Sequence, residues 1–137
     1  MDDTQLVELA CEARERAYVP YSNFSVGAAL LDAEGRVWQG CNIENAAFGP
    51  SVCAERTAFF KAVSEGARAF EAIAVVGGPE GREIDSYTAP CGVCRQVMRE
   101  FCNVRSFRVI LAASRDEYRS YTLEELLPAS FGPENLA

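Results

Sequence analysis

The chain has 137 residues, 49% of them hydrophobic, which suits one domain with a sizeable core spanning residues 1–137. Its net charge is −7 and its thirteen basic residues are spread along the chain, which argues against a nucleic-acid partner. The acidic N-terminal segment is unlike a signal peptide, and no stretch is apolar for long enough to cross a bilayer. We therefore expect a cytoplasmic protein with no membrane partner.

Histidine is absent, and six residues are cysteines. The absence excludes Ser–His and Cys–His nucleophilic pairs, histidine general bases and histidine metal ligands. Acid–base chemistry must then use Glu, Asp, Lys, Tyr or Cys. A disulfide framework is typical of secreted, loop-rich scaffolds, so we expect reduced thiols, some of them bound to a metal ion.

The first elements are a helix and a hairpin. Apolar residues at helical spacing predict a helix over residues 4–17, which ends before Pro20 because the residue preceding a proline avoids the helical region. Residues 26–32 and 36–42 then have the pattern of two strands. Gly35 lies between them and can adopt the positive φ of a short turn, so the pair predicts a hairpin.

The rest of the chain alternates helices and strands. The expected elements are a helix at 53–65, an apolar strand at 71–78, a helix from 91 to about 101, a buried strand at 107–113, an edge strand at 118–121 and a short helix at 122–127. This order predicts an α/β fold, a three-layer α/β/α sandwich with a mixed, partly parallel five-stranded sheet.

Two short segments place cysteines at the starts of predicted helices, Cys53-Ala54-Glu55 and Pro90-Cys91-Gly92-Val93-Cys94. Free N–H groups and the helix dipole favour thiolates at such positions. Three thiolates on two neighbouring helices form a candidate metal site, and zinc is the leading metal for such ligands. The other cysteines lack ligand spacing, so we expect water as the fourth ligand, as in catalytic zinc sites.

Glu55 and Arg56 follow the first of these cysteines. Positions three, four and seven residues after Glu55 are apolar, so its carboxylate lies on the inward face of the helix. There it is a candidate base that takes a proton from the water and returns it to the substrate. Arg56 lies on the same helix face as Cys53 and can offset the thiolate charge. A closed structural zinc site, with Glu55 as an ordinary helix-start charge, remains an alternative.

These motifs match the signature of the zinc deaminases, in which Cys or His, one residue and Glu precede P-C-x-x-C. The segments YVPYSNFSVGAALL, GCNIENAAFGPSVCAERTAFFKAVSEG, PCGVCRQVMREF and ELLPASFGPENL extend the match, and the chain resembles the small homotetrameric cytidine deaminases over nearly its whole length. The resemblance implies one zinc ion per subunit on Cys53, Cys91 and Cys94. It also implies deamination of cytidine and deoxycytidine in pyrimidine salvage, with Glu55 as the proton shuttle.

The resemblance further implies the contacts to a nucleoside substrate. The backbone at Ala54 would contact the pyrimidine ring, and Phe24 would pack against the base. Asn42 and Glu44 of the NIEN segment would hold the ribose 3′-hydroxyl. Phe131 matches an aromatic residue that covers the active site of an adjacent subunit, so we expect a homotetramer with shared sites.

Phe48 departs from the family pattern, in which tyrosine is common at this position. The missing hydroxyl predicts weaker binding of the nucleoside's 5′-hydroxyl, by about 0.5–1.5 kcal/mol. Three alternatives remain open: a deaminase of a blasticidin S-type antibiotic, a nucleic-acid-editing deaminase, and a zinc-stabilised module without catalysis. The complete NIEN segment argues against the first, and the acidic charge balance against the second.

Overall fold

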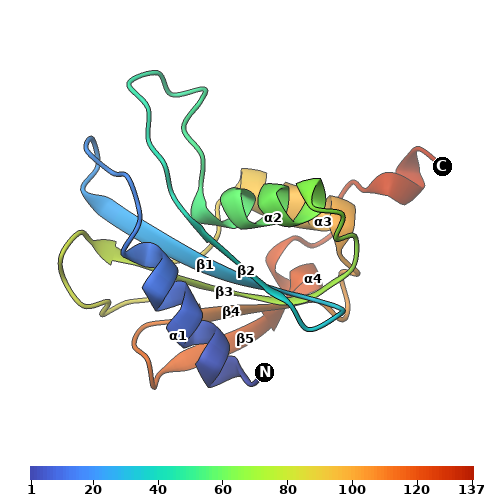
Figure 1. Ribbon diagram of the computed structural model, residues 1–137. Coiled ribbons are helices and arrows are strands. Elements are labelled where there is room, and N and C mark those ends of the chain that lie inside the picture. The colour runs from blue at the N-terminus through green and yellow to red at the C-terminus, as the bar shows by residue number, and fades with distance from the viewer.

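The computed structural model describes residues 1–137 and has three layers (Figure 1). A five-stranded sheet lies in the middle, helix α1 covers one face, and helices α2 and α3 cover the other. The predicted α/β/α sandwich is therefore confirmed. None of the helices is long and apolar enough to span a membrane.

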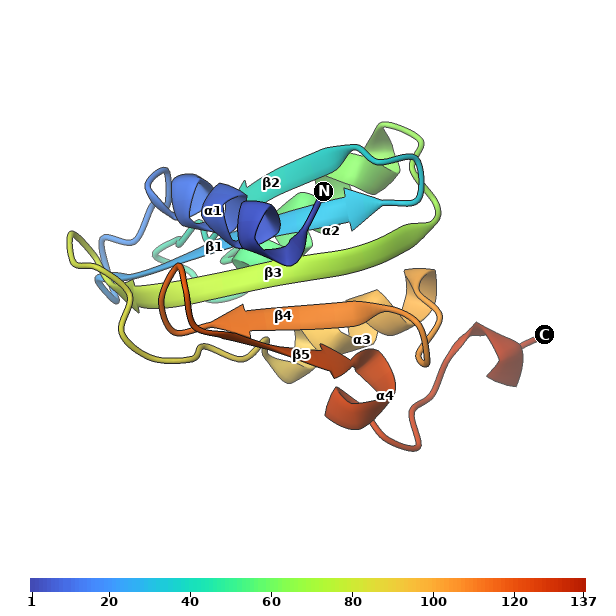
Figure 2. The same ribbon diagram turned by 90° about the horizontal axis from the view of Figure 1, so that it is seen from below.

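The strands lie in the order β2-β1-β3-β4-β5 (Figure 2). Their bounds are Phe24–Asp32 for β1, Val37–Cys41 for β2, Phe70–Pro79 for β3, Arg108–Ala112 for β4 and Tyr118–Thr122 for β5. Strands β3 and β4 are parallel because a crossover through α3 joins them, and all other neighbours are antiparallel. The sheet is thus mixed and partly parallel, as predicted, and Gly35 has the expected positive φ of 89° in the β1–β2 turn.

The helix bounds are Asp3–Arg14 for α1, Ala54–Ser64 for α2, Gly92–Phe101 for α3 and Leu123–Leu126 for α4, with a 3₁₀ turn at Pro133–Asn135 that was not predicted. Helix α1 ends at Arg14 rather than at residue 17. The chain turns there toward the sheet, and the Tyr18 backbone N–H donates to the carbonyl of Asn42 at 3.0 Å. A tertiary contact therefore overrides the helical periodicity.

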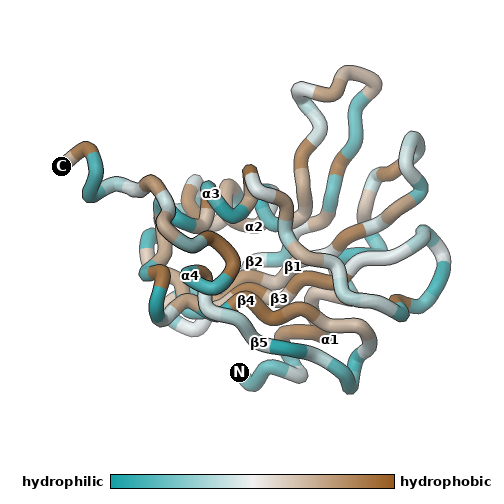
Figure 3. The backbone as a smooth tube through the Cα atoms, turned by 180° about the vertical axis from the view of Figure 1, so that it is seen from behind, coloured by the Kyte–Doolittle hydropathy of each residue, from teal (hydrophilic) through white to brown (hydrophobic).

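The core has two parts, one on each face of the sheet. The larger part lies under α2 and α3 around Phe59, whose ring centroid is 5.1 Å from that of Phe70 in an edge-on arrangement. The smaller part lies under α1. Strand β3 is covered on both faces, as its apolar sequence predicts, and Figure 3 shows hydrophobic residues along β3 and β4. This packing fixes α2 and α3 side by side on one face.

Candidate active site

The three predicted metal ligands converge at the starts of α2 and α3. The Sγ atom of Cys91 lies 3.6 Å from that of Cys53 and 3.5 Å from that of Cys94, and all three lie within 4.8 Å of one another. Sulfur ligands about 2.3 Å from one tetrahedral zinc ion would lie about 3.8 Å apart, so this spacing fits zinc. The cluster contains no fourth cysteine or carboxylate ligand, so a tetrahedral zinc ion bound here would keep one position for a water molecule.

Local backbone geometry directs the sulfur atoms to this point. Cys53 and Cys91 are the N-cap residues of α2 and α3, both with extended backbone angles. N-cap side chains usually accept a hydrogen bond from the first turn, but neither thiol does so here. Cys94 follows in the first turn of α3 and is 1% exposed. The Cys53 and Cys91 sulfurs therefore face each other and Cys94 instead of capping their helices.

The thiols differ in acidity. The neighbouring Cys94 thiol lowers the pKa of Cys53 to about 5 against the effect of burial, and the hydrogen bond from Arg56 and the contact with Cys91 assist. The same interaction with Cys53, together with burial, raises the pKa of Cys94. The expectation that all three cysteines are thiolates stays a prediction, because metal binding itself displaces thiol protons.

Glu55 and Arg56 both face the sulfur cluster. The Glu55 side chain lies on the inner face of α2 and the residue is 4% exposed. Burial raises the pKa of Glu55 to about 7, the negative charge of Cys53 acts in the same direction, and a contact with Cys94 acts against it. Arg56 Nη2 donates to Cys53 Sγ at 3.3 Å, whereas its buried Nε has no hydrogen-bond partner. The site thus pairs a buried carboxyl group with an arginine directed at the thiols.

Asn42 and Glu44 hold the segment that carries Phe24. Asn42 Oδ1 accepts from the Val26 backbone N–H at 2.9 Å, and Asn42 Nδ2 donates to the Phe24 carbonyl at 3.0 Å. The Glu44 carboxylate accepts three hydrogen bonds from the backbone and hydroxyl groups of residues 21–22. Both side chains are therefore fixed in place, and their expected role toward a ribose stays a prediction.

The predicted aromatic residues lie on separate segments. The Phe24 ring lies against Gly77 at the end of β3, where a Cβ on the glycine would come within 3.1 Å of it. Phe48 is 95% exposed in the loop between β2 and α2, which extends away from the sheet in Figure 1. Phe131 is 59% exposed, and its carbonyl accepts a hydrogen bond from Gln96. In the single chain, Phe48 and Phe131 therefore face solvent.

Two further residues near the cluster were not singled out in the sequence. Arg95 Nε donates to the carbonyl of Pro90, directly before the ligand Cys91, at 2.8 Å. No sequence signal distinguishes Arg95 from the other arginines. Gly40 in β2 lies directly against the first turn of α2. A glycine inside a strand does signal a close backbone approach, so this feature was detectable.

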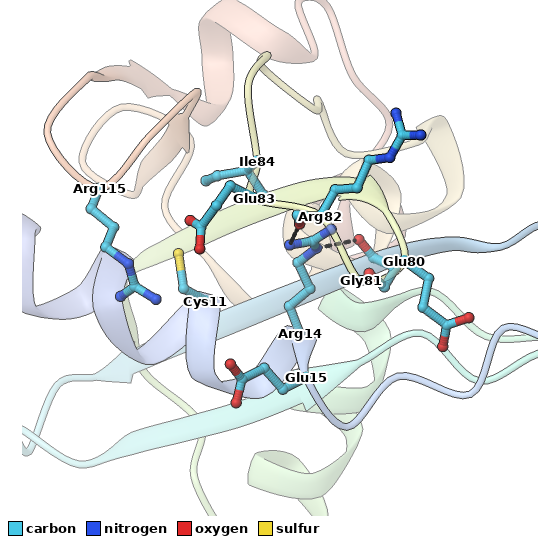
Figure 4. A pocket seen from close by; sticks show the side chains of 10 residues that line it. Cys11, Arg14, Glu15, Glu80, Gly81, Arg82, Glu83, Ile84 and Arg115 are labelled. Carbon is cyan, nitrogen blue, oxygen red and sulfur yellow. Dashed lines mark hydrogen bonds between the residues drawn. The ribbon is translucent and has the colours of Figure 1, made fainter.

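A cavity of about 420 Å³ lies on the α1 side of the sheet and contains none of the predicted site residues (Figure 4). The Arg14 guanidinium crosses it and donates to the carbonyl oxygens of Ser25 at 3.1 Å, Arg82 at 2.8 Å and Pro79 at 2.7 Å. Each of the three guanidinium nitrogens of Arg14 therefore donates one hydrogen bond. It ties α1 to the segment that leads from β3 toward Cys91, which is a structural role.

Comparisons with known proteins agree with this geometry. Residues 1–111 match the family model for the cytidine and deoxycytidylate deaminase zinc-binding region. The cytidine deaminase of Sporosarcina psychrophila is 50% identical over 137 residues, which cover 100% of this chain and 96% of that protein. The cytidine deaminase of Halalkalibacterium halodurans is 48% identical over 136 residues, or 99% of this chain and 98% of that protein.

The fold agrees as well. The crystal structure of the cytidine deaminase from Burkholderia pseudomallei superposes with a TM-score of 0.86 at 47% identity, over 96% of this chain and 100% of that one. The matched family region binds zinc, the metal that the spacing of Cys53, Cys91 and Cys94 fits. Since the family model matches residues 1–111 and relatives of 48–50% identity match the chain over its whole length, this chain belongs to the cytidine and deoxycytidylate deaminase family.

Proposed function

We propose that this member of the family catalyses the hydrolytic deamination of cytidine and deoxycytidine to uridine and deoxyuridine, with release of ammonia. One observation carries the proposal: three thiols suited to zinc, with no fourth protein ligand, lie beside the buried carboxyl group of Glu55. A structural zinc site is normally closed by a fourth protein ligand. Similarity to cytidine deaminases over the whole chain supports a nucleoside substrate.

Cys53, Cys91 and Cys94 would hold a zinc ion, which would supply a Lewis acid that activates water. Glu55 accepts a proton from this water and gives it to N3 of the cytosine ring as the water oxygen bonds to C4. Glu55 then carries the remaining proton of that oxygen to the exocyclic amino group. The C4–N4 bond breaks, ammonia leaves, and the oxygen stays on C4 as the carbonyl of uridine.

The remaining predicted residues orient the substrate. Phe24 packs against the base and the Ala54 backbone contacts its edge, which places C4 next to the metal site. Asn42 and Glu44 hold the ribose 3′-hydroxyl. Support comes from the hydrogen bonds that fix both side chains beside Phe24, since a fixed polar pair loses little entropy on binding.

The active form is a homotetramer in which Phe131 of one subunit covers the site of its neighbour. Phe48 and Phe131 support this arrangement, because both are large apolar side chains that a single chain leaves exposed. Shared sites make assembly part of the activity. Sedimentation should then give a mass close to four times the 15.0 kDa of one chain.

The test is an ultraviolet assay of cytidine and deoxycytidine conversion, with zinc measured in the same samples. Zinc-loaded wild-type protein should convert the nucleosides, and Glu55→Gln should keep one zinc ion per subunit. The variant should lose at least about 100-fold in kcat, because the amide cannot carry protons. The proposal fails if the zinc-loaded wild-type protein converts neither nucleoside, or if Glu55→Gln retains full turnover.

A further inference from the structure

Gly40 is the point at which the sheet meets the first turn of α2. A Cβ atom on Gly40 would lie 2.5 Å from the carbonyl oxygen of Ala54 and 2.6 Å from the backbone nitrogen of Ala58. Real Cβ atoms essentially never approach other atoms within 3.0 Å. Both neighbours are backbone atoms, so no side-chain rotation can relieve the contact. Helix and strand backbones are therefore in direct contact at this glycine.

This contact lies under the first turn of α2, next to the candidate metal ligand Cys53 and the candidate proton carrier Glu55. Ala54 stands between Cys53 and Glu55, so any shift of its carbonyl moves both neighbours. The three atoms nearest to the Gly40 Cβ position all belong to α2. Cys91 and Cys94 stand on α3 instead. A side chain at position 40 would therefore displace one half of the metal site relative to the other.

Gly27 makes the same kind of contact on the opposite face. A Cβ there would lie 2.1 Å from the carbonyl oxygen of Ala10 and 2.5 Å from the backbone nitrogen of Arg14, both in α1. Gly27 is in β1 and pairs with Cys41, the residue after Gly40. The two glycines thus lie close together in neighbouring strands. Helix α1 carries no metal ligand, which makes Gly27 a matched control.

We infer that Gly40 is a positioning residue for the metal centre. Its missing side chain sets how closely the first turn of α2 approaches the sheet, and thereby where the Cys53 sulfur and the Glu55 carboxyl group lie relative to the thiols on α3. The inference rests on the proposed function only through the roles of Cys53 and Glu55. It is tested by metal binding as well as by turnover.

The size of the expected effect follows from the contact distance. Ordinary contacts of a Cβ atom are 3.4–4 Å, so Gly40→Ala requires α2 to move outward by about 1 Å. A misplacement of that size in an active site can lower the rate by about 100-fold. Gly27→Ala forces a comparable movement on α1, but that helix carries no metal ligand and no catalytic group.

The experiment compares Gly40→Ala with Gly27→Ala in three measurements. Zinc affinity comes from competition with a chromophoric chelator, coordination geometry from the visible absorption bands of the cobalt(II)-substituted protein, and kcat and KM from the nucleoside assay. Both variants should be less stable to urea than the wild type. Only Gly40→Ala should bind zinc at least about 10-fold more weakly, change the cobalt spectrum and lose about 100-fold in kcat, with a smaller change in KM.

Three results would overturn the inference. One is a Gly40→Ala protein whose cobalt spectrum and zinc affinity equal those of the wild type. Another is a Gly27→Ala protein with the same losses. The third is a Gly40→Ala protein that fails to fold even in trimethylamine N-oxide, an osmolyte that favours compact states. In that case α2 could not move outward to make room for the added methyl group. The cobalt and zinc measurements need no turnover, so failure of the proposed function would be recognised separately.

Discussion

Replacing Arg95 with alanine should weaken zinc binding while leaving the fold intact. Arg95 Nε donates to the Pro90 carbonyl at 2.8 Å, and Nη1 donates to the Leu126 carbonyl at 2.7 Å. Pro90 directly precedes the ligand Cys91, whereas Leu126 ends α4. One guanidinium group therefore joins the ligand turn of α3 to the C-terminal part of the chain.

The magnitude follows from these two hydrogen bonds. A hydrogen bond from a charged donor contributes about 1.5–3 kcal/mol, and Arg95 is only half-buried, so the lower end of that range applies. The hydrogen bond to the Pro90 carbonyl then stabilises the turn that carries Cys91 by about 1.5 kcal/mol. If that energy is expressed fully in metal binding, the zinc dissociation constant of Arg95→Ala rises about tenfold.

The assay is zinc competition with a chromophoric chelator, and Arg99→Ala is its control. Arg99 also binds the C-terminal segment, with Nε donating to Ser130 Oγ at 2.7 Å and the guanidinium paired with Glu134, but it makes no hydrogen bond to the ligand turn. Arg99→Ala should therefore keep the wild-type zinc affinity. Equal zinc affinity in Arg95→Ala and the wild type, or an equal loss in both variants, would refute the reasoning.

Two other predictions concern stability and substrate binding. Asp32 is 2% exposed, and burial alone would raise its pKa, but hydrogen bonds from Trp38 and from the backbone of Arg36 and Glu34 outweigh burial and lower the pKa. Its stabilisation is therefore full above the unfolded value of about 3.9 and is lost as the pH falls through the folded pKa. Asp32→Asn should cost about 1–3 kcal/mol of unfolding free energy at pH 7, and urea titrations that show the same difference at pH 3 would contradict this. Phe48→Tyr should lower KM for cytidine by about 2- to 13-fold through one added hydrogen bond, and an unchanged KM would remove that idea.

Elements with a strong hydrophobic pattern or a clear turn-forming residue could be predicted from the sequence. The apolar run of β3 and the turn at Gly35 appear in the structure as expected, since their determinants are local. The end of α1 could not be predicted, because it depends on the backbone contact between Tyr18 and Asn42, which are far apart in the sequence. The 3₁₀ turn at Pro133–Asn135 was also missed, because it lies in a segment that side chains of α3 hold in place.

The chemistry of the site was more predictable than its support. Cys53, Cys91 and Cys94 were found because ligand spacing and the absence of histidine restrict the possible metal sites. The internal hydrogen bonds of Asn42 and Glu44 were not foreseen, because their donors and acceptors come from another segment of the chain. Contacts of this kind depend on tertiary structure, and a motif within one segment does not show which distant residues it will contact.

The four α-helices begin in two different ways. Helices α1 and α4 begin with complete capping boxes, formed by Asp2 with Gln5 and by Thr122 with Glu125. Helices α2 and α3 begin with cysteines that make no capping hydrogen bond. A missing cap typically costs about 1 kcal/mol per helix, and thiolates can recover part of it through the helix dipole. The two helices without a side-chain cap are the two whose first turns would hold the metal, so we expect zinc binding to order these turns.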